Sequence, residues 1–320
     1  MDPHRIRYIL NTAITSKRNH PSRSEPQSRE VAFYGGTFTR LPISKMTELL
    51  KAVNPYIEQG HFQTIRVSTR PDAVDEERLC LIKDLGVSTV ELGVQSLDDD
   101  VLKASKRGYT AEDVLKSVQM LHKHAFRVGI QLMPGLPEDS YERFMNTVHG
   151  VLSIKPHMVR LYPAIVIKGT ELEKLYYANK YQPLSLEEAV AICQDSCLHL
   201  EGNGIPVIRM GLMASPSLTA DGQIVAGPWH EAFGFLVRSS IHQKSIEPYL
   251  PLYGTVQQVG LRVPNREIPL VRGYKNQGLD IIEKKTGVKV LYVKGDASVP
   301  SGQVEIDRFE GPFKIKNQPS

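Results

Sequence analysis

The sequence predicts an α/β fold, namely a partial (β/α)6 TIM-like barrel followed by a small α+β domain. From residue 31 to about residue 211, short apolar runs of strand length alternate with amphipathic segments of helix length. These runs recur at a spacing of roughly 30 residues, which is typical of parallel strands joined by right-handed helical crossovers. Glycine, proline and small polar residues follow the runs, at the strand ends where such folds bind their ligands.

The predicted elements follow one another in a regular order. An amphipathic helix begins near residue 46, and the apolar run before it stops at Gly35-Gly36. A full TIM barrel has eight strand–helix units, more than this segment supplies, so an open or partial barrel is favoured. A doubly wound sheet is the structural alternative. The expected strands are 31–34, 64–69, 89–94, 127–133 and 158–162, and further helices are expected over 74–85, 111–124 and 141–152.

The rhythm changes after a helix predicted over residues 185–201. Residues 205–211 predict a closing strand, and a stretch rich in proline, glycine and serine follows. Residues 267–309 predict a strand up to Arg272, a helix and two more strands. The expected division is a basic loop over 1–30, the barrel over 31–204, a closing and linking segment over 205–266, and the small α+β domain over 267–320.

Composition is typical of a soluble globular protein. The 320 residues are 41% hydrophobic and 23% charged, with a net charge of +4. No stretch approaches the roughly 20 apolar residues of a membrane span, and the first residues lack the layout of a signal peptide. Three scattered cysteines do not suggest a disulfide framework. We therefore expect a cytoplasmic protein with no membrane partner.

The first 30 residues are basic. Six lysines and arginines stand against one acidic residue, Glu25, between residues 4 and 29, and serines and prolines accompany them over 21–28. This composition predicts a flexible basic loop. A solvated linker is favoured over a nucleic-acid contact, because charge alone does not distinguish the two and linkers are commoner.

Several of these motifs resemble the radical SAM superfamily, in the branch of the Elongator catalytic subunit and, more distantly, oxygen-independent coproporphyrinogen oxidase. The resemblance covers roughly residues 1–200 and implies a radical SAM barrel that lacks its first strand. The matching runs are VAFYGGTFT at 31–39, STRPD at 68–72, ELGVQSL at 91–97, RG at 107–108 and LMPGLP at 132–137.

The resemblance implies two cofactors, S-adenosyl-L-methionine (SAM) and a 4Fe-4S cluster. In intact relatives a Cys-x3-Cys-x2-Cys motif holds the cluster, and an electron from a reductant protein lets it cleave SAM to a 5′-deoxyadenosyl radical. Here the flanking residues 3–5 and 13–15 place the three cluster positions on Asp2, Ile6 and Ile9. We therefore expect that this chain does not hold the cluster. A misread gene start, gene decay and a non-catalytic paralogue remain alternative explanations.

The resemblance also implies which residues contact SAM. Glycine backbone at the first strand end would meet the amino group, polar residues at the third strand end the ribose, an arginine the carboxylate, and a backbone stretch after the fourth strand the adenine. The set is Gly35, Gly36, Thr37, Ser68, Gln95, Ser96, Arg107, Met133, Pro134 and Gly135. Without the resemblance, the same residues would be strand-end turns, caps and a solvated arginine. No catalytic residue and no metal-ligand set is assigned.

Several function classes remain open. The first is a radical SAM family protein, implied to act in tRNA modification, whose enzymatic status the missing cluster ligands leave open. The second is a non-catalytic RNA-binding or scaffold protein on the same barrel, because the loop at 273–276 resembles the Gly-x-x-Gly loop of KH domains. A cluster-free barrel enzyme is least supported. Tyr162 and Trp229-His230 are either substrate contacts or core, whereas Cys193 and Cys197 are expected to be buried thiols.

Overall fold

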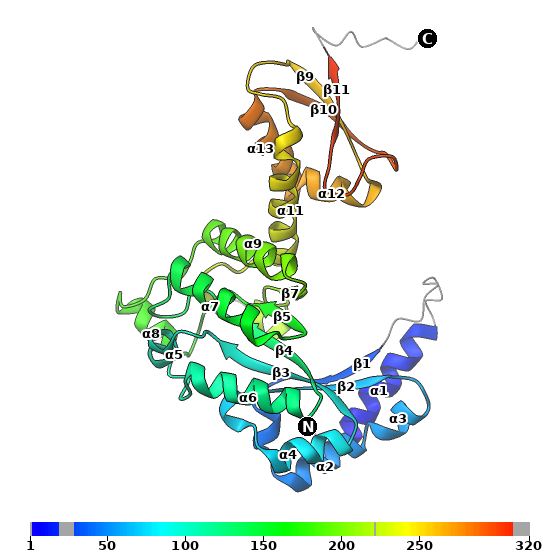
Figure 1. Cartoon of the computed structure of the whole chain (residues 1–320), viewed down its shortest axis with the longest axis vertical. Coiled ribbons are helices and arrows are strands. Elements are labelled where there is room, and N and C mark those ends of the chain that lie inside the picture. Colours follow the sequence, from blue (N-terminus) through cyan, green and yellow to red (C-terminus); the bar gives the residue numbers. More distant parts are fainter. Residues whose placement is uncertain (1, 19–28, 221, 310–320) are drawn as a thin grey trace.

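A six-stranded parallel sheet forms the larger part of the protein in the computed structural model, which describes residues 2–18, 29–220 and 222–309. The strand order β1-β2-β3-β4-β5-β7 follows the chain without a reversal, and the sheet curls into an open half-barrel (Figure 1). This confirms the partial barrel and excludes the doubly wound alternative, whose strand order reverses. The strands are β1 (Glu30–Phe33), β2 (Thr64–Thr69), β3 (Val87–Gln95), β4 (Arg127–Leu132), β5 (Met158–Leu161) and β7 (Val207–Met210).

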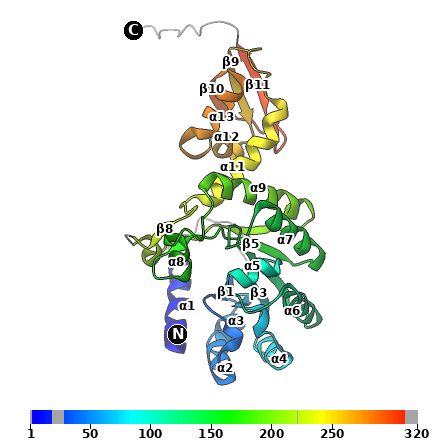
Figure 2. The ribbon, with the colours of Figure 1, turned by 90° about the vertical axis from the view of Figure 1, so that its left-hand side faces the viewer.

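Helices cover the convex face of this sheet, and Figure 2 shows several of them on one side of the strands. Most begin at a serine, threonine or aspartate whose side chain accepts a backbone N–H of the first turn, as Asp75 and Thr110 do. No helix within the described ranges is long and apolar enough to span a bilayer. The barrel helices are α2 (Ile43–Lys51), α3 (Asn54–Glu58), α4 (Glu76–Asp84), α5 (Asp99–Ala104), α6 (Ala111–Lys123), α7 (Tyr141–Ile154), α8 (Glu171–Tyr177) and α9 (Leu186–Gly202).

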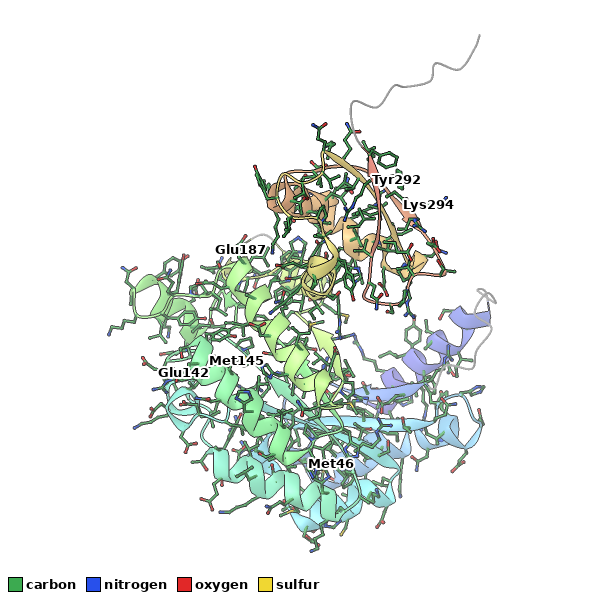
Figure 3. All side chains as sticks on the ribbon, turned by 45° about the horizontal axis from the view of Figure 1, so that its top comes forward. Met46, Glu142, Met145, Glu187, Tyr292 and Lys294 are labelled. Atoms are coloured by element: carbon green, nitrogen blue, oxygen red, sulfur yellow. The ribbon has the colours of Figure 1, made fainter. Side chains whose placement is uncertain are left out.

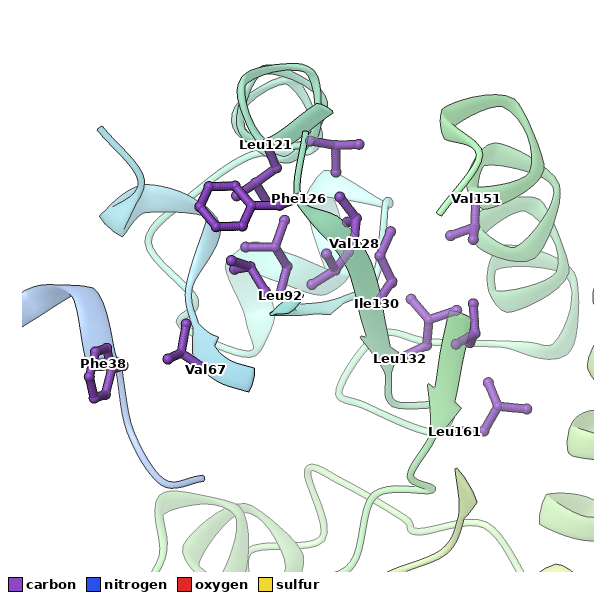
Figure 4. Packing of buried hydrophobic residues seen from close by; sticks show 14 of the residues in the cluster. Phe38, Val67, Leu92, Leu121, Phe126, Val128, Ile130, Leu132, Val151 and Leu161 are labelled. Atoms are coloured by element: carbon purple, nitrogen blue, oxygen red, sulfur yellow. The ribbon is translucent and has the colours of Figure 1, made fainter. Parts of the chain in front are cut away.

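The main core lies between the sheet and these helices. Figure 4 shows Leu92, Ile130 and Leu132 of the strands packed with Phe126 and Val151. Alternate residues of β2 are buried, so one face of the strand joins the core and the opposite face points into the concave side of the half-barrel. The alternation therefore separates an apolar convex face from a concave face that is free to carry polar groups.

The N-terminal segment differs from its prediction. The flexible basic loop predicted for residues 1–30 is wrong over Pro3–Arg18, which form helix α1, and residues 19–28 lie outside the described ranges. The reason is an apolar stripe: Ile6 and Leu10 are one helical turn apart and both join the main core. The prediction rested on the charged residues of this segment and did not take the apolar stripe into account.

The C-terminal unit is a three-stranded sheet with its own core, in the order β10-β9-β11. Its strands are β9 (Gln258–Val263), β10 (Lys289–Gly295) and β11 (Glu305–Phe309), and its helices are α12 (Ile268–Arg272) and α13 (Gln277–Thr286). Tyr292 and Lys294 of β10 lie in this unit, whereas Met46 lies deep in the barrel core (Figure 3). The long helix α11 (Phe233–Ile246) packs against both α9 and α12 and runs between the two units (Figure 1).

Two predictions for this unit are wrong. The apolar run that ends at Arg272 is helix α12, because Pro269 occupies the first turn of a helix, where its missing N–H costs nothing. The central strand β9 lies before residue 267, so the C-terminal unit begins earlier than the predicted boundary. Shorter elements complete the chain: η1 (Phe38–Arg40), η2 (Pro71–Ala73), β6 (Val166–Ile167), α10 (Pro216–Thr219), β8 (Ile224–Ala226), η3 (Glu247–Tyr249), η4 (Asn265–Glu267) and η5 (Tyr274–Asn276).

We expect Ile6→Ala to lower the free energy of unfolding by about 2 to 4 kcal/mol, because it opens a cavity in the core. Ile9→Ala is the matched control, since Ile9 is on the same helix but 46% exposed, and its loss should stay below about 1 kcal/mol. Urea unfolding followed by circular dichroism measures both values. Equal losses for the two variants would contradict the packing of α1 on the barrel.

Candidate functional site

A cavity of about 670 Å³ lies at the carboxyl ends of the barrel strands. Its volume is within the range of small-molecule sites. Most of the predicted site residues line it, namely Gly35, Gly36, Thr37, Ser68, Gln95 and Arg107. They come from the ends of β1, β2 and β3 and from the turn after α5, so residues far apart in the sequence meet at one edge of the sheet.

The remaining predicted residues lie beside this cavity and not on its wall. Ser96 is buried, its hydroxyl lies 3.2 Å from that of Thr147, and it accepts the backbone N–H of Asp98 at 3.1 Å, so its local role is to cap a turn. Met133 lines an adjacent apolar pocket of about 230 Å³ together with Arg107, whose Nη2 lies 3.4 Å from the methionine sulfur. The carbonyl of Pro134 accepts a backbone hydrogen bond, also at the edge of this pocket.

Gly135 holds the turn after β4 in place. Its φ of +81° favours glycine, and an added Cβ would lie 2.7 Å from Leu184 Cδ1. Its N–H donates to Asp139 Oδ2 at 2.9 Å, and its carbonyl accepts the Tyr181 hydroxyl at 2.6 Å. Burial raises the pKa of Asp139 to about 6, although two backbone N–H donors favour its charged form. The turn therefore fixes the position of Met133 through a small polar network.

Gln95 ends β3 in a strained backbone conformation. It is buried, it has a φ of +69°, and the pairing of β3 with β4 shifts register just before it. The Tyr109 hydroxyl donates to the Gly93 carbonyl at 2.7 Å, and Gln131 Nε2 donates to Gln95 Oε1 at 3.1 Å. Such strain persists only where surrounding contacts hold it, and it concentrates at binding sites. These contacts fix the orientation of the Gln95 side-chain amide at the cavity wall.

Arg107 is a partly buried cation of the cavity and has no ion-pair partner within the described part of the chain. Its Nε is buried and makes no hydrogen bond, and burial lowers the pKa of its guanidinium. Arg70, its neighbour, is already occupied by Asp72 through bonds of 2.8 and 2.9 Å. A buried guanidinium without a counter-ion is unfavourable, so Arg107 favours an anionic ligand in the cavity.

A charge network on the concave face escaped the sequence prediction. Glu91 of β3 is only 3% exposed. Its Oε2 accepts a hydrogen bond from Nη1 of Arg160 on β5 at 2.5 Å. Its Oε1 accepts a hydrogen bond from Nη1 of Arg66 on β2. Arg66 Nε in turn donates to Glu30 of β1 at 2.5 Å. Between β3 and β5, Gly129 leaves room, since a Cβ there would lie 2.9 Å from Glu91 Cγ. The available sequence signal was a single charged residue within each of the predicted strands that became β2, β3 and β5.

The three cysteines do not form a cluster site. Cys80 is exposed on α4, and Cys193 and Cys197 are buried in α9, as predicted, where burial raises the pKa of both thiols, that of Cys197 to about 12. No group of three or more His, Cys, Asp or Glu side chains suited to a metal ion occurs within the described ranges. A 4Fe-4S cluster requires a close set of thiolates. The donors of this chain therefore do not fit the cluster.

The other candidates have separate locations. Tyr162 lines the main cavity, whereas Trp229 and His230 line a small neighbouring pocket. The loop at Gly273 packs against α11: an added Cβ would lie 2.7 Å from Gly278 N and 3.3 Å from Ser239 Oγ. Its glycine thus serves a close approach between helices. RNA binding through this loop stays a prediction.

Sequence profiles of known families match two consecutive segments of the chain. The radical SAM superfamily profile matches residues 22–150, and the radical SAM C-terminal domain profile matches residues 156–243. This chain belongs to the radical SAM superfamily. The first match spans the strand-end motifs of β1 to β4, and the second spans β5 and β7 and ends within α11.

The similar proteins belong to the predicted branch of this superfamily. Over 129 residues the chain is 37% identical to a tRNA uridine(34) acetyltransferase of Methanocaldococcus jannaschii, covering 39% of this chain and 24% of that protein. It is 30% identical over 131 residues to human Elongator complex protein 3, covering 40% and 24%. The structure of Elp3 from Methanocaldococcus infernus, with residues 1–46 deleted, superposes with a TM-score of 0.63 at 26% identity, covering 76% and 61%. The chain thus spans about a quarter of these two curated relatives.

We expect Glu91→Gln to destabilise the barrel by about 3 kcal/mol or more, because it leaves two buried arginines without their shared carboxylate. Glu112→Gln is the control, since Glu112 is 73% exposed and pairs with Lys116 on the surface of α6; its effect should stay below about 1 kcal/mol. Thermal and urea unfolding measure the difference. Similar stability of the two variants would show that the network does not support the fold.

Proposed function

We propose that this radical SAM family protein binds SAM in the cavity at the strand ends. The observation that supports the proposal is Arg107, a partly buried guanidinium that lines the cavity without a counter-ion in the described structure. Arg107 would hold the α-carboxylate of SAM, which would supply that counter-ion and accept hydrogen bonds from the guanidinium. The membership in this superfamily suggests SAM as the ligand, and the hydrogen-bond donors of the cavity suit SAM.

The remaining wall residues match other parts of SAM. Gly35 and Gly36 both have positive φ and leave the backbone open at the end of β1, where an amino group can approach it. The Gln95 amide, held by Gln131, offers a hydrogen bond to a ribose hydroxyl. The apolar pocket of Met133 and Ala164, on the other side of Arg107, suits a flat adenine ring. In this superfamily bound SAM supplies a 5′-deoxyadenosyl radical when a 4Fe-4S cluster reduces it.

We further propose that the protein takes part in tRNA modification. The support is its similarity to a tRNA uridine(34) acetyltransferase and to Elongator complex protein 3, over about 40% of this chain. Because the cysteines do not fit a cluster, we derive no radical step for the chain. The alternative is a non-catalytic RNA-binding or scaffold role on the same barrel, which the misfit of the cluster favours.

Isothermal titration calorimetry with SAM tests the first proposal. We expect Arg107→Ala to weaken SAM binding by about tenfold or more, since a charged hydrogen-bonded pair contributes about 1.5 to 3 kcal/mol. Arg107→Lys should retain part of the affinity because it keeps the charge but loses the fork.

The control for this experiment is Arg127→Ala, which removes an exposed arginine at the opposite end of the sheet, where β4 begins. Its SAM affinity should equal that of the wild type. If the wild type does not bind SAM, or if Arg107→Ala binds it as tightly, the proposal fails.

Anaerobic reconstitution with iron and sulfide tests the expectation that this chain holds no cluster. We expect no cluster absorbance and no stoichiometric iron after desalting, because Cys80 is far in the sequence from Cys193 and Cys197, and these two thiols are buried. A Cys80→Ser, Cys193→Ser and Cys197→Ser triple variant measures the background. A cluster signal that disappears in this variant would contradict the expectation.

A further inference from the structure

The charged groups of the cavity leave a second cation without a carboxylate. Arg66 and Arg160 share Glu91, Arg66 also pairs with Glu30, and Arg70 pairs with Asp72. No ion pair to Arg209 occurs among the described residues, although Arg209 lines the same cavity at the end of β7. One anionic ligand group would neutralise Arg107. Arg209 therefore favours a second anionic group in the cavity.

Arg209 also lies beside a like charge. In the pairing of β5 with β7, Arg160 and Arg209 are partners, so two arginines leave neighbouring backbone positions at this edge of the sheet, and both contact Tyr162. Like charges in such positions repel each other. Glu91 partly neutralises the charge of Arg160 through a single hydrogen bond from Nη1. The Arg160 side chain is only 8% exposed, and its buried Nε has no hydrogen-bond partner. An anion near this pair would relieve the repulsion and offer acceptors for the free donors.

Two tyrosines complete the surroundings of this pair. The guanidinium of Arg160 lies 4.8 Å from the centre of the Tyr34 ring and 5.0 Å from that of Tyr162. Contacts of this kind hold the guanidinium in place. Arg209 also hydrogen-bonds the Tyr162 hydroxyl, whose pKa is raised by burial. Tyr34 remains 55% exposed, so it presents an accessible aromatic side chain next to the cations.

We propose that Arg209, Arg160 and the flanking tyrosines form a second anion subsite, which binds a phosphate or carboxylate group of the second substrate while Tyr34 stacks on a flat ring of the same molecule. This inference rests on the proposed function in one respect, because it assumes that Arg107 binds the carboxylate of SAM. The two anion positions are separated along the strand order, since Arg107 follows the central strand β3 and Arg209 lies on the edge strand β7, with β4 and β5 between them. A substrate bound here would be anionic and aromatic.

Uridine 5′-monophosphate is the probe, titrated by calorimetry with and without saturating SAM. We expect Arg209→Ala to weaken its binding by about tenfold or more, as the loss of a charged hydrogen-bonded contact implies. Tyr34→Ala should weaken binding of the nucleotide more than binding of inorganic phosphate, because it removes the stacking surface while Tyr162 still contacts the Arg160 guanidinium. Arg209 is the better position to vary, since no carboxylate in the described structure depends on it, whereas Arg160→Ala would leave Glu91 with one partner fewer.

Competition experiments distinguish the source of the anion. Displacement of the nucleotide by phosphate but not acetate assigns a phosphate group, and the reverse assigns a carboxylate; either supports the subsite. Uridine binding as tightly as its monophosphate, an unchanged affinity in Arg209→Ala, or no nucleotide binding at all would overturn it.

Arg107→Ala separates this inference from the proposed function, since it should lower SAM affinity and leave nucleotide affinity unchanged. If the nucleotide instead competes with SAM and responds to Arg107→Ala, the second subsite is refuted and SAM binding still stands. Arg127→Ala again serves as the neutral control, and an unchanged thermal midpoint in Arg209→Ala establishes that the variant is folded.

Discussion

The carboxylate of Glu91 is the contact on which the concave side of the barrel depends. It lies between the guanidinium groups of Arg66 and Arg160 and so links β2, β3 and β5 across the interior of the sheet. A parallel sheet is usually apolar on both faces, but an open half-barrel leaves its inner face polar. With Glu30 beyond Arg66, the network balances two cations with two anions. Side chains nearer the strand ends are then free to meet a ligand.

This balance separates arginines that are paired with carboxylates of the chain from arginines that are not. Arg66 and Arg70 are held by carboxylates of the chain itself, at Glu91, Glu30 and Asp72. Arg107 and Arg209 have no such partner in the described structure, and both line the cavity. Burying charge without a partner is costly, so the protein retains these two cations at the expense of stability. The positive charge available in the site is therefore set by the arginines that have no carboxylate partner.

Much of the fold was predictable, for reasons visible in particular elements. The prediction of β2 as residues 64–69 is confirmed to the residue, because its apolar and polar positions alternate and a proline follows shortly after. Helix α1 was missed because Ile6 and Leu10 are a sparse stripe among charges, which becomes informative only when a barrel is present to cover it. Strand β9 was missed because the apolar run at 268–271 is a stronger local signal than the strand itself. The strand-end turns and Arg107 were identified through motifs, whereas the pairing of Glu91 with Arg160 joins residues 69 positions apart and has no local signature.

The distribution of the cysteines has a practical consequence for studying this protein in solution. Two of the three thiols are inside α9, and burial keeps them protonated, so they react poorly with alkylating reagents. Cys80 alone is exposed, on α4, and it does not line the strand-end cavity. A maleimide dye or nitroxide added to the unmodified chain would therefore attach at one defined point on the outer layer. The natural sequence therefore already provides one reactive thiol for labelling, away from the strand-end cavity, without any cysteine being removed.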